Sequence, residues 1–110
     1  MVIIVYFIYD LSKIKIGYSK NPKQRLKCLK TAISNGKLIL LGTIHSDMNL
    51  EKELHRKFDY IRVPNTREWF QVHPDLIDYI NKNNCLMNHL ELSQDDKGNN
   101  KIQVYKKMIK

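Results

Sequence analysis

The stretch before residue 20 constrains the fold most strongly, because it holds two short runs with the alternating pattern of β-strands. Residues 2–9 (VIIVYFIY) and 13–19 (KIKIGYS) each send successive side chains to opposite faces. Only Asp10, Leu11 and Ser12 separate the two runs. Such a short connection predicts a β-hairpin with one apolar face turned toward a core.

The other face of this hairpin combines groups that are typical of a functional site. If the loop holds an even number of residues, Tyr6 and Lys15 share that face, directly opposite each other or one diagonal step apart. An odd loop or a bulge would separate them. Gly17 adds a bare stretch of backbone on the same strand. A phenol, an ammonium group and an open backbone together predict a site.

The composition indicates a single basic domain. A chain of 110 residues holds one core, and a net charge of +8 with a pI near 9.5 favours nucleic acid as partner, although a solvated basic surface would have the same composition. No apolar run approaches the roughly 20 residues of a membrane span, and residues 2–9 lack the basic start of a signal peptide. Cys28 and Cys85 are too far apart for a metal knuckle; as reduced thiols they indicate a cytoplasmic protein, or a host-cell intracellular one if the source is viral or phage.

A helix is predicted after the hairpin. Asn21 and Pro22 are an N-cap and a first helical residue, and the helix should run to about Ser34. Arg25 falls in its first turn, beside backbone N–H groups that favour an anion, so its guanidinium suits a phosphate. Every charged residue from position 13 to 30 is basic, and these side chains should converge on one surface: Lys13, Lys15, Lys20, Lys23, Arg25, Lys27 and Lys30.

The middle of the chain predicts a strand and a second helix. Residues 37–44 (KLILLGTI) are nearly all apolar, as expected of a central strand covered on both faces. Residues 46 and 47 would cap a helix that runs to about Tyr60 with a buried stripe of Leu50, Leu54 and Phe58. Glu51 and His55 stand four residues apart, so they project together along one edge of that stripe. Such a pair is usually only a surface contact.

The last third predicts an aromatic anchor, a third helix and an uncertain end. At least one of Trp69 and Phe70 should enter the core. A helix should start at residues 73–74 and end near residue 84. Residues 86–92 and 101–105 can pair as strands across a turn-rich segment, and a frayed basic tail is the alternative.

Five short motifs, taken in order, resemble the GIY-YIG nuclease superfamily, in its phage and meiotically up-regulated gene branch. They are Tyr6, Lys15-Ile16-Gly17 with a following serine, Arg25, Glu51-x-x-Leu54-His55 and Glu68-Trp69-Phe70. The resemblance covers about residues 2–80. It implies an α+β GIY-YIG fold: a small antiparallel three-stranded sheet flanked by helices, in the order β-β-α-β-α-α. Residues 1–84 would form the nuclease-like domain and residues 85–110 a C-terminal extension.

The resemblance also implies a metal-dependent endonuclease that hydrolyses DNA phosphodiester bonds. Glu51 would be the single carboxylate ligand of Mg²⁺ or Mn²⁺, and Arg25 would grip the scissile phosphate. Tyr6, with Lys15 beside it, would orient or deprotonate the attacking water. His55 would contact phosphate, shuttle a proton or position Glu51. Nucleic-acid contacts are implied for Gly17, Ser19, Lys20, Lys23 and Lys27.

One departure favours a second interpretation. Leu29 stands where many relatives carry a tyrosine or histidine, and we expect the attached DNA-recognition domain on which such nucleases often rely to be missing. Both points favour a catalytically weak or inactive nucleic-acid-binding module of the same fold. In either case the expected partner is DNA, with no membrane and no small-molecule cofactor, and the protein is a monomer or a homodimer. DNA and RNA are not distinguished by these residues.

Overall fold

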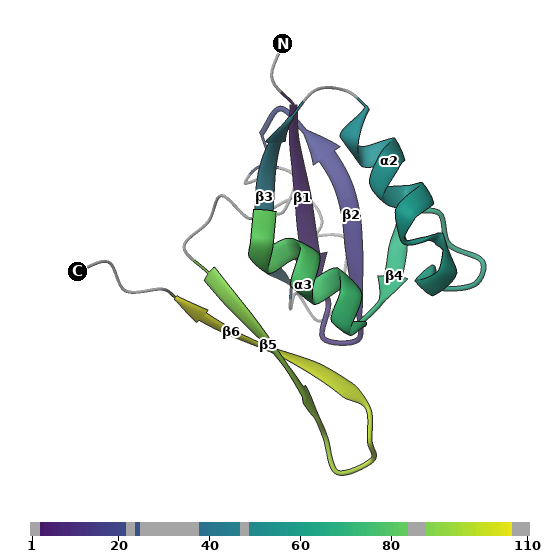
Figure 1. Ribbon diagram of the computed structural model, residues 1–110, viewed down its shortest axis with the longest axis vertical. Helices are drawn as coiled ribbons and strands as arrows, with labels where there is room; N and C mark the ends of the chain where they lie inside the picture. The colour runs from purple at the N-terminus through teal and green to yellow at the C-terminus, as the bar shows by residue number, and fades with distance from the viewer. Residues whose placement is uncertain (1–2, 22–23, 25–37, 47–48, 84–87, 107–110) are drawn as a thin grey trace.

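A four-stranded antiparallel sheet forms the centre of the protein. The computed structural model describes residues 3–21, 24, 38–46, 49–83 and 88–106 (Figure 1). The strands lie in the spatial order β3-β1-β2-β4, and their bounds are β1 Ile3–Tyr9, β2 Lys13–Ser19, β3 Ile39–Ser46 and β4 Trp69–Gln71. β1 and β2 are the hairpin predicted from the alternating runs.

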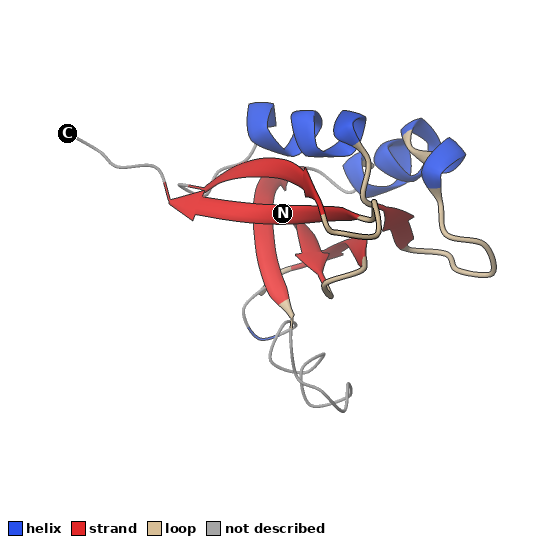
Figure 2. Cartoon of the chain, turned by 90° about the horizontal axis from the view of Figure 1, so that it is seen from below, coloured by secondary structure: helices blue, strands red, loops and turns tan. Residues whose placement is uncertain are grey.

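Both described helices cover one face of this sheet. α2 spans Leu50–Lys57 and continues into a short 3₁₀ turn, η1, at Asp59–Ile61; α3 spans Pro74–Asn83 (Figure 2). The fold is therefore of the α+β class, as predicted. Among the described residues, no helix has the length and apolarity needed to cross a membrane.

The main core lies between the sheet and the helices. Alternate residues of the hairpin point into it, including Phe7 and Ile16, which are fully buried. α2 contributes Leu54, and the residue that ends the helix, Phe58, is buried beside it. α3 adds its buried stripe of Leu76, Ile77 and Ile80, as its periodicity predicts.

The opposite face of the sheet is also buried. Tyr6 and Ile8 form a second apolar cluster there with Leu38, and Leu40 packs against it. We predicted that this face would be open at Tyr6, Lys15 and Gly17, but Tyr6 and Lys15 are 2% and 6% exposed. A sheet covered on both faces has little room for an open site on either face. We therefore look for side chains that a substrate can reach at the edges of the sheet.

The turn of the hairpin is organised by Asp10. Its Oδ1 accepts hydrogen bonds from the backbone N–H groups of Ser12 and Lys13 at 2.9 and 2.8 Å, and its Oδ2 lies 2.8 Å from the Lys13 ammonium. Leu11 takes the left-handed conformation that this tight turn needs, with φ of 78°. Burial alone would raise the pKa of Asp10, but the hydrogen bonds from Lys13 and Ser12 outweigh it and hold the pKa below its usual value.

Replacing Asp10 with asparagine should therefore lower the free energy of unfolding by about 1–2 kcal/mol at pH 7. Because the pKa of the carboxyl is lower in the folded protein, its contribution is complete above the ordinary value of about 4 and is lost as the pH falls through the folded-state value. Urea unfolding of both proteins should show a difference in the free energy of unfolding at pH 7, and this difference should become smaller toward about pH 2.5. Equal stabilities at pH 7 would contradict this account of the turn.

Several predictions about the middle of the chain are wrong in detail. The apolar run at residues 37–44 is not a central strand: β3 lies at one edge of the sheet, and it is apolar because both faces are covered. The sheet has four strands and not three, since β4 pairs with β2. α2 starts later than predicted, with Asn49 at its N-cap, because residue 46 still belongs to β3.

The predicted first helix, residues 21–34, lies almost entirely outside the described residues. Its expected cap is within them: the Asn21 side-chain oxygen accepts a hydrogen bond from the Gln24 N–H at 3.2 Å.

The C-terminal residues form a second hairpin. β5 (Asn88–Gln94) pairs antiparallel with β6 (Asn100–Lys106), so the alternative of a frayed tail is wrong for these residues. Leu90 and Ile102 enter the main core, and Asn81 of α3 exchanges two hydrogen bonds with the backbone of Leu90. The hairpin is thus docked on α3 through its apolar face, and only the tip of its turn projects beyond the sheet (Figure 1).

Candidate active site

Glu51 and His55 meet on the exposed edge of α2. Leu54 faces the core, and Glu51, three positions before it, and His55, the next residue, are both half-buried at the boundary between core and solvent. His55 Nε2 lies 3.1 Å from Glu51 Oε1 and 2.9 Å from the backbone oxygen of Ile16 in β2. The His55 ring also packs edge-on against Phe70. The pair is therefore anchored to the sheet and is more than a surface contact.

These distances determine which nitrogen of His55 carries a proton. A backbone carbonyl and an ionised carboxylate can only accept hydrogen bonds. Nε2 must therefore be protonated to contact both Ile16 and Glu51. A protonated Nε2 holds the carboxylate in place, and this contact favours the positioning role among the three that we considered for His55; any proton taken up by the neutral ring would go to Nδ1.

A hollow of about 410 Å³ opens beside this pair. Its walls come from α2, from the segment after η1 and from the residues just before β4. They carry two carboxylates, one imidazole and four basic side chains: Glu51, Glu68, His55, Lys52, Arg56, Arg62 and Arg67. Carboxylates within a cationic rim can bind a hard cation, and the basic side chains can bind an anionic substrate around it.

Lys15 connects this hollow to the hairpin. Its ammonium group lies 3.3 Å from Glu68 Oε2, and its side chain is 8% exposed against 43% for that of Glu68. A buried ammonium needs a partner of opposite charge, and Glu68 supplies it. The backbone places the two together, because the Ile16 N–H donates to the Glu68 carbonyl at 3.0 Å. Lys15 thus fixes the position of Glu68, which forms part of one wall of the hollow.

Arg62 joins the remaining walls. Its Nη2 donates to the His55 carbonyl at 2.9 Å and its Nη1 to the Arg67 carbonyl at 2.8 Å. Its Nε lies 3.0 Å from Asp59 Oδ1, close enough for charge attraction but not aligned as a hydrogen bond. The guanidinium packs over the Phe70 ring at 5.3 Å. Arg62 therefore connects the helix that carries Glu51 to the segment that carries Glu68.

Tyr6 does not lie where its predicted role would require it. It pairs directly across from Gly17, and Lys15 follows one diagonal step away on the same face, as the even register predicts. Among the described residues that line the hollow, however, Tyr6 does not appear. Its ring lies over Gly17, where an added Cβ would come 2.5 Å from the Tyr6 hydroxyl oxygen. The space over this glycine is filled by the phenol, so glycine is needed here for packing.

The exchange of Gly17 for alanine should consequently lower the free energy of unfolding by about 1–3 kcal/mol, through overpacking against Tyr6. Urea unfolding measures this loss. In a Tyr6→Leu background the same exchange should cost clearly less, because the ring that the new methyl group meets is gone. An equal loss in both backgrounds would exclude the Tyr6 contact as its cause.

The other predicted contact residues lie apart from the hollow or outside the described part of the chain. Ser19 is half-buried at the end of β2, and its hydroxyl accepts a hydrogen bond from the Asn21 N–H. Lys20 is exposed beside it. Arg25, Lys23 and Lys27 are outside the described residues. Of the predicted site residues, the structure brings Glu51 and His55 together, and Lys15 reaches the hollow through its contact with Glu68.

Sequence reasoning missed five residues of the hollow: Lys52, Arg56, Arg62, Arg67 and Glu68. Glu68 was assigned to a motif without a role, and Arg62 and Arg67 were not singled out. Arginines beside a turn carry no local signal of their own. Their positions follow from the turn at residues 63–66, where Asn65 has a φ of 65° and the Thr66 N–H donates to the Val63 carbonyl, which brings the segment back along η1.

The donor set at the hollow suits a weakly held divalent cation. No group of three or more acidic, histidine or cysteine side chains that could enclose a metal occurs among the described residues. Glu51 and Glu68 both line the hollow. Mg²⁺ commonly binds to only one or two carboxylates. Its other coordination positions are filled by several waters and by phosphate oxygens of the substrate.

The sheet and the helices form a small α+β domain with a cationic hollow, and a family comparison agrees with a nucleic-acid-related function. The T5orf172 domain family matches residues 3–85, most of the chain, and the protein belongs to this family. No curated protein matches the chain, and no solved structure does.

This match corrects the resemblance drawn from the motifs. The family found is T5orf172 and not GIY-YIG, so that assignment is wrong. Each of the motifs spans only one to five residues, and short motifs recur by chance far more readily than a match over residues 3–85.

Proposed function

We propose that this protein is a metal-dependent endonuclease that hydrolyses phosphodiester bonds of DNA. The observation that carries the proposal is the Glu51–His55 pair at 3.1 Å, anchored to the Ile16 carbonyl within a hollow rimmed by four basic side chains. The protein's net charge of +8 supports a polyanionic substrate.

The residues of the hollow divide into three roles. Glu51 would hold Mg²⁺ or Mn²⁺, with Glu68 as the other carboxylate that lines the hollow; the metal, when bound, would supply charge stabilisation for the developing phosphorane. His55 keeps the Glu51 carboxylate in position through its Nε2 proton. Lys52, Arg56 and Arg67 lie at the rim, where they would bind the phosphates on either side of the reacting one. Arg25, which lies outside the described residues, stays in the proposal as the phosphate-gripping group, whereas Tyr6 does not line the hollow and is left without the water-orienting role.

A second candidate is a nucleic-acid-binding module without useful turnover. The position of Tyr6 favours it: the side chain is buried against Gly17 and does not line the hollow, so a water bound at Glu51 would have no tyrosine beside it in this arrangement. The cationic rim serves binding equally well.

Nicking of supercoiled plasmid separates the two candidates. An endonuclease should convert it to open circles with Mg²⁺ or Mn²⁺ and stop when EDTA is added. Absence of nicking with either metal, together with DNA binding whose log K falls with log[salt] at a slope of about −4 to −5, for about five contacted phosphates, would establish the binding module instead.

A further inference from the structure

A second hollow lies at the far end of the β2–β4 pair, where three turns of the chain meet. It has a volume of about 520 Å³, within the range of about 300–1,000 Å³ that is usual for small-ligand sites. The β1–β2 turn, the end of β4 and the β5–β6 turn supply its walls. We call it the turn pocket; its lining residues are Ser12, Lys13, Val63, Gln71, Val72, Asn99, Asn100 and Lys101.

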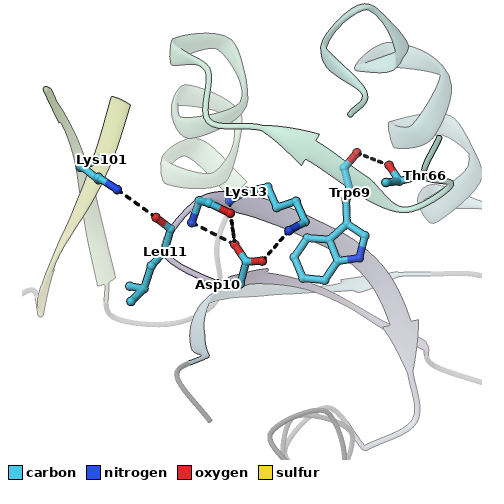
Figure 3. A network of polar contacts seen from close by, with 7 residues as sticks. Asp10, Leu11, Lys13, Thr66, Trp69 and Lys101 are labelled. Atoms are coloured by element: carbon cyan, nitrogen blue, oxygen red, sulfur yellow. Dashed lines mark hydrogen bonds and ion pairs between the residues drawn. The ribbon is translucent and has the colours of Figure 1, made fainter. Parts of the chain in front are cut away.

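Hydrogen bonds hold the three turns together. The Lys101 ammonium donates to the Leu11 carbonyl at 3.2 Å, and the Asn100 side-chain amide donates to the Val72 carbonyl at 3.1 Å. Lys13 is fixed between Asp10 and the face of the Trp69 ring, 4.8 Å from its centre (Figure 3). Contacts between segments that are far apart in the sequence thus form the pocket, and its walls are fixed to one another by hydrogen bonds.

The lining chemistry matches a nucleotide. Gln71 and Asn99 are exposed side-chain amides, each with donors and an acceptor for the edge of a base. Val63 gives a partly exposed apolar wall for its flat face, whereas the Val72 side chain is buried in the main core. Lys101 puts an ammonium group at the pocket, where it suits the attached phosphate, while the Lys13 ammonium is held by Asp10 and the Trp69 ring.

The pocket shares its strands with the candidate active site. Lys13 pairs with Gln71 at the turn pocket, and three residues further along β2 the Ile16 N–H bonds to the Glu68 carbonyl at the other hollow. Three strand residues span about 10 Å. This is about three base steps of a duplex, whose strands carry a phosphate about every 3.4 Å along the axis.

We propose that the turn pocket binds an unpaired nucleotide of the nucleic-acid substrate, within about three steps of the phosphate at the candidate active site. A stacked and paired base cannot enter a hollow between turns, whereas a base outside the stack presents its edges to amides and its face to apolar groups. The inference rests on the proposed function only for the identity of that phosphate. Asn99, Asn100 and Lys101 lie beyond the family match at residues 3–85, so this chain's own C-terminal hairpin completes the pocket.

The test compares two labelled DNA duplexes of the same sequence, one fully paired and one with a single unpaired adenine. Fluorescence anisotropy in EDTA measures binding without cleavage, so a failure of the nuclease proposal would not affect the result. The unmodified protein should bind the bulged duplex about 10-fold more tightly. The double variant Gln71→Ala/Asn99→Ala should lose this preference to within about 2-fold while its affinity for the paired duplex is unchanged.

Matched controls keep the test decisive. Gln103→Ala removes an exposed amide from β6 outside the pocket and should retain the full preference. Equal binding of the two duplexes, or a preference that survives in the double variant, would each overturn the proposal.

Discussion

Exchange of Glu51 for glutamine should lower the rate of Mg²⁺-dependent plasmid nicking by about 10³-fold. The amide keeps the size of the side chain but removes the negative charge that would hold the cation, and charge stabilisation by a bound metal is worth several kcal/mol in the transition state. The His55 contact at 3.1 Å should survive, since an amide oxygen also accepts a hydrogen bond. The loss should therefore appear in kcat, with the melting temperature little changed.

Glu53→Gln is the matched control for this variant. Glu53 lies in the first turn of the same helix, is exposed, and does not line the hollow, so its exchange changes the net charge equally. It should nick plasmid at the unmodified rate. If Glu51→Gln and Glu53→Gln nick equally fast, Glu51 is not the metal ligand and the proposed site is wrong.

Exchange of His55 for alanine should lower the nicking rate by about 10- to 100-fold, the usual cost of losing a side chain that orients a metal ligand. It removes both the 3.1 Å contact to Glu51 and the 2.9 Å contact to the Ile16 carbonyl. The carboxylate would then be free to turn toward the arginines at the rim. Part of the loss should appear as a weaker apparent affinity for Mg²⁺, measured by titrating the metal.

The variant His55→Gln distinguishes a role of His55 in positioning Glu51 from a role in proton transfer. Its amide can donate a hydrogen bond as Nε2 does but cannot titrate, so His55→Gln should restore a large part of the activity that alanine loses. The dependence of kcat on pH should keep its shape between about pH 6 and 9 in this variant. Disappearance of one limb of that profile in His55→Gln would show that the imidazole itself transfers a proton.

Local patterns in the sequence predicted most of the separate elements. Alternation indicated β1 and β2, and the apolar stripe Leu76, Ile77 and Ile80 indicated α3. These predictions succeed because the period of buried residues is a property of a few consecutive positions. The ends of α2 were predicted less accurately, because a serine and an aspartate with the pattern of a helix cap precede the true N-cap at Asn49.

The candidate site was predicted only in part. The four-residue spacing of Glu51 and His55 placed them together, and the even register placed Tyr6 and Lys15 on one face. No local pattern indicated that this face would be covered, or that Glu68 would become the partner of Lys15. Both depend on which strands pair and on what packs over the sheet.

By itself, then, the sequence determined the hairpin, the amphipathic helices and the positive charge, because periodicity and composition act within short stretches of chain. Tertiary structure alone decided the order of the strands, the burial of Tyr6 over Gly17, and the two hollows at either end of the β2–β4 pair. Those features need contacts between residues far apart in the chain, such as Arg62 with the His55 carbonyl and Lys101 with the Leu11 carbonyl. Such contacts form only when the whole core is assembled, because their geometry is set by the packing of other elements.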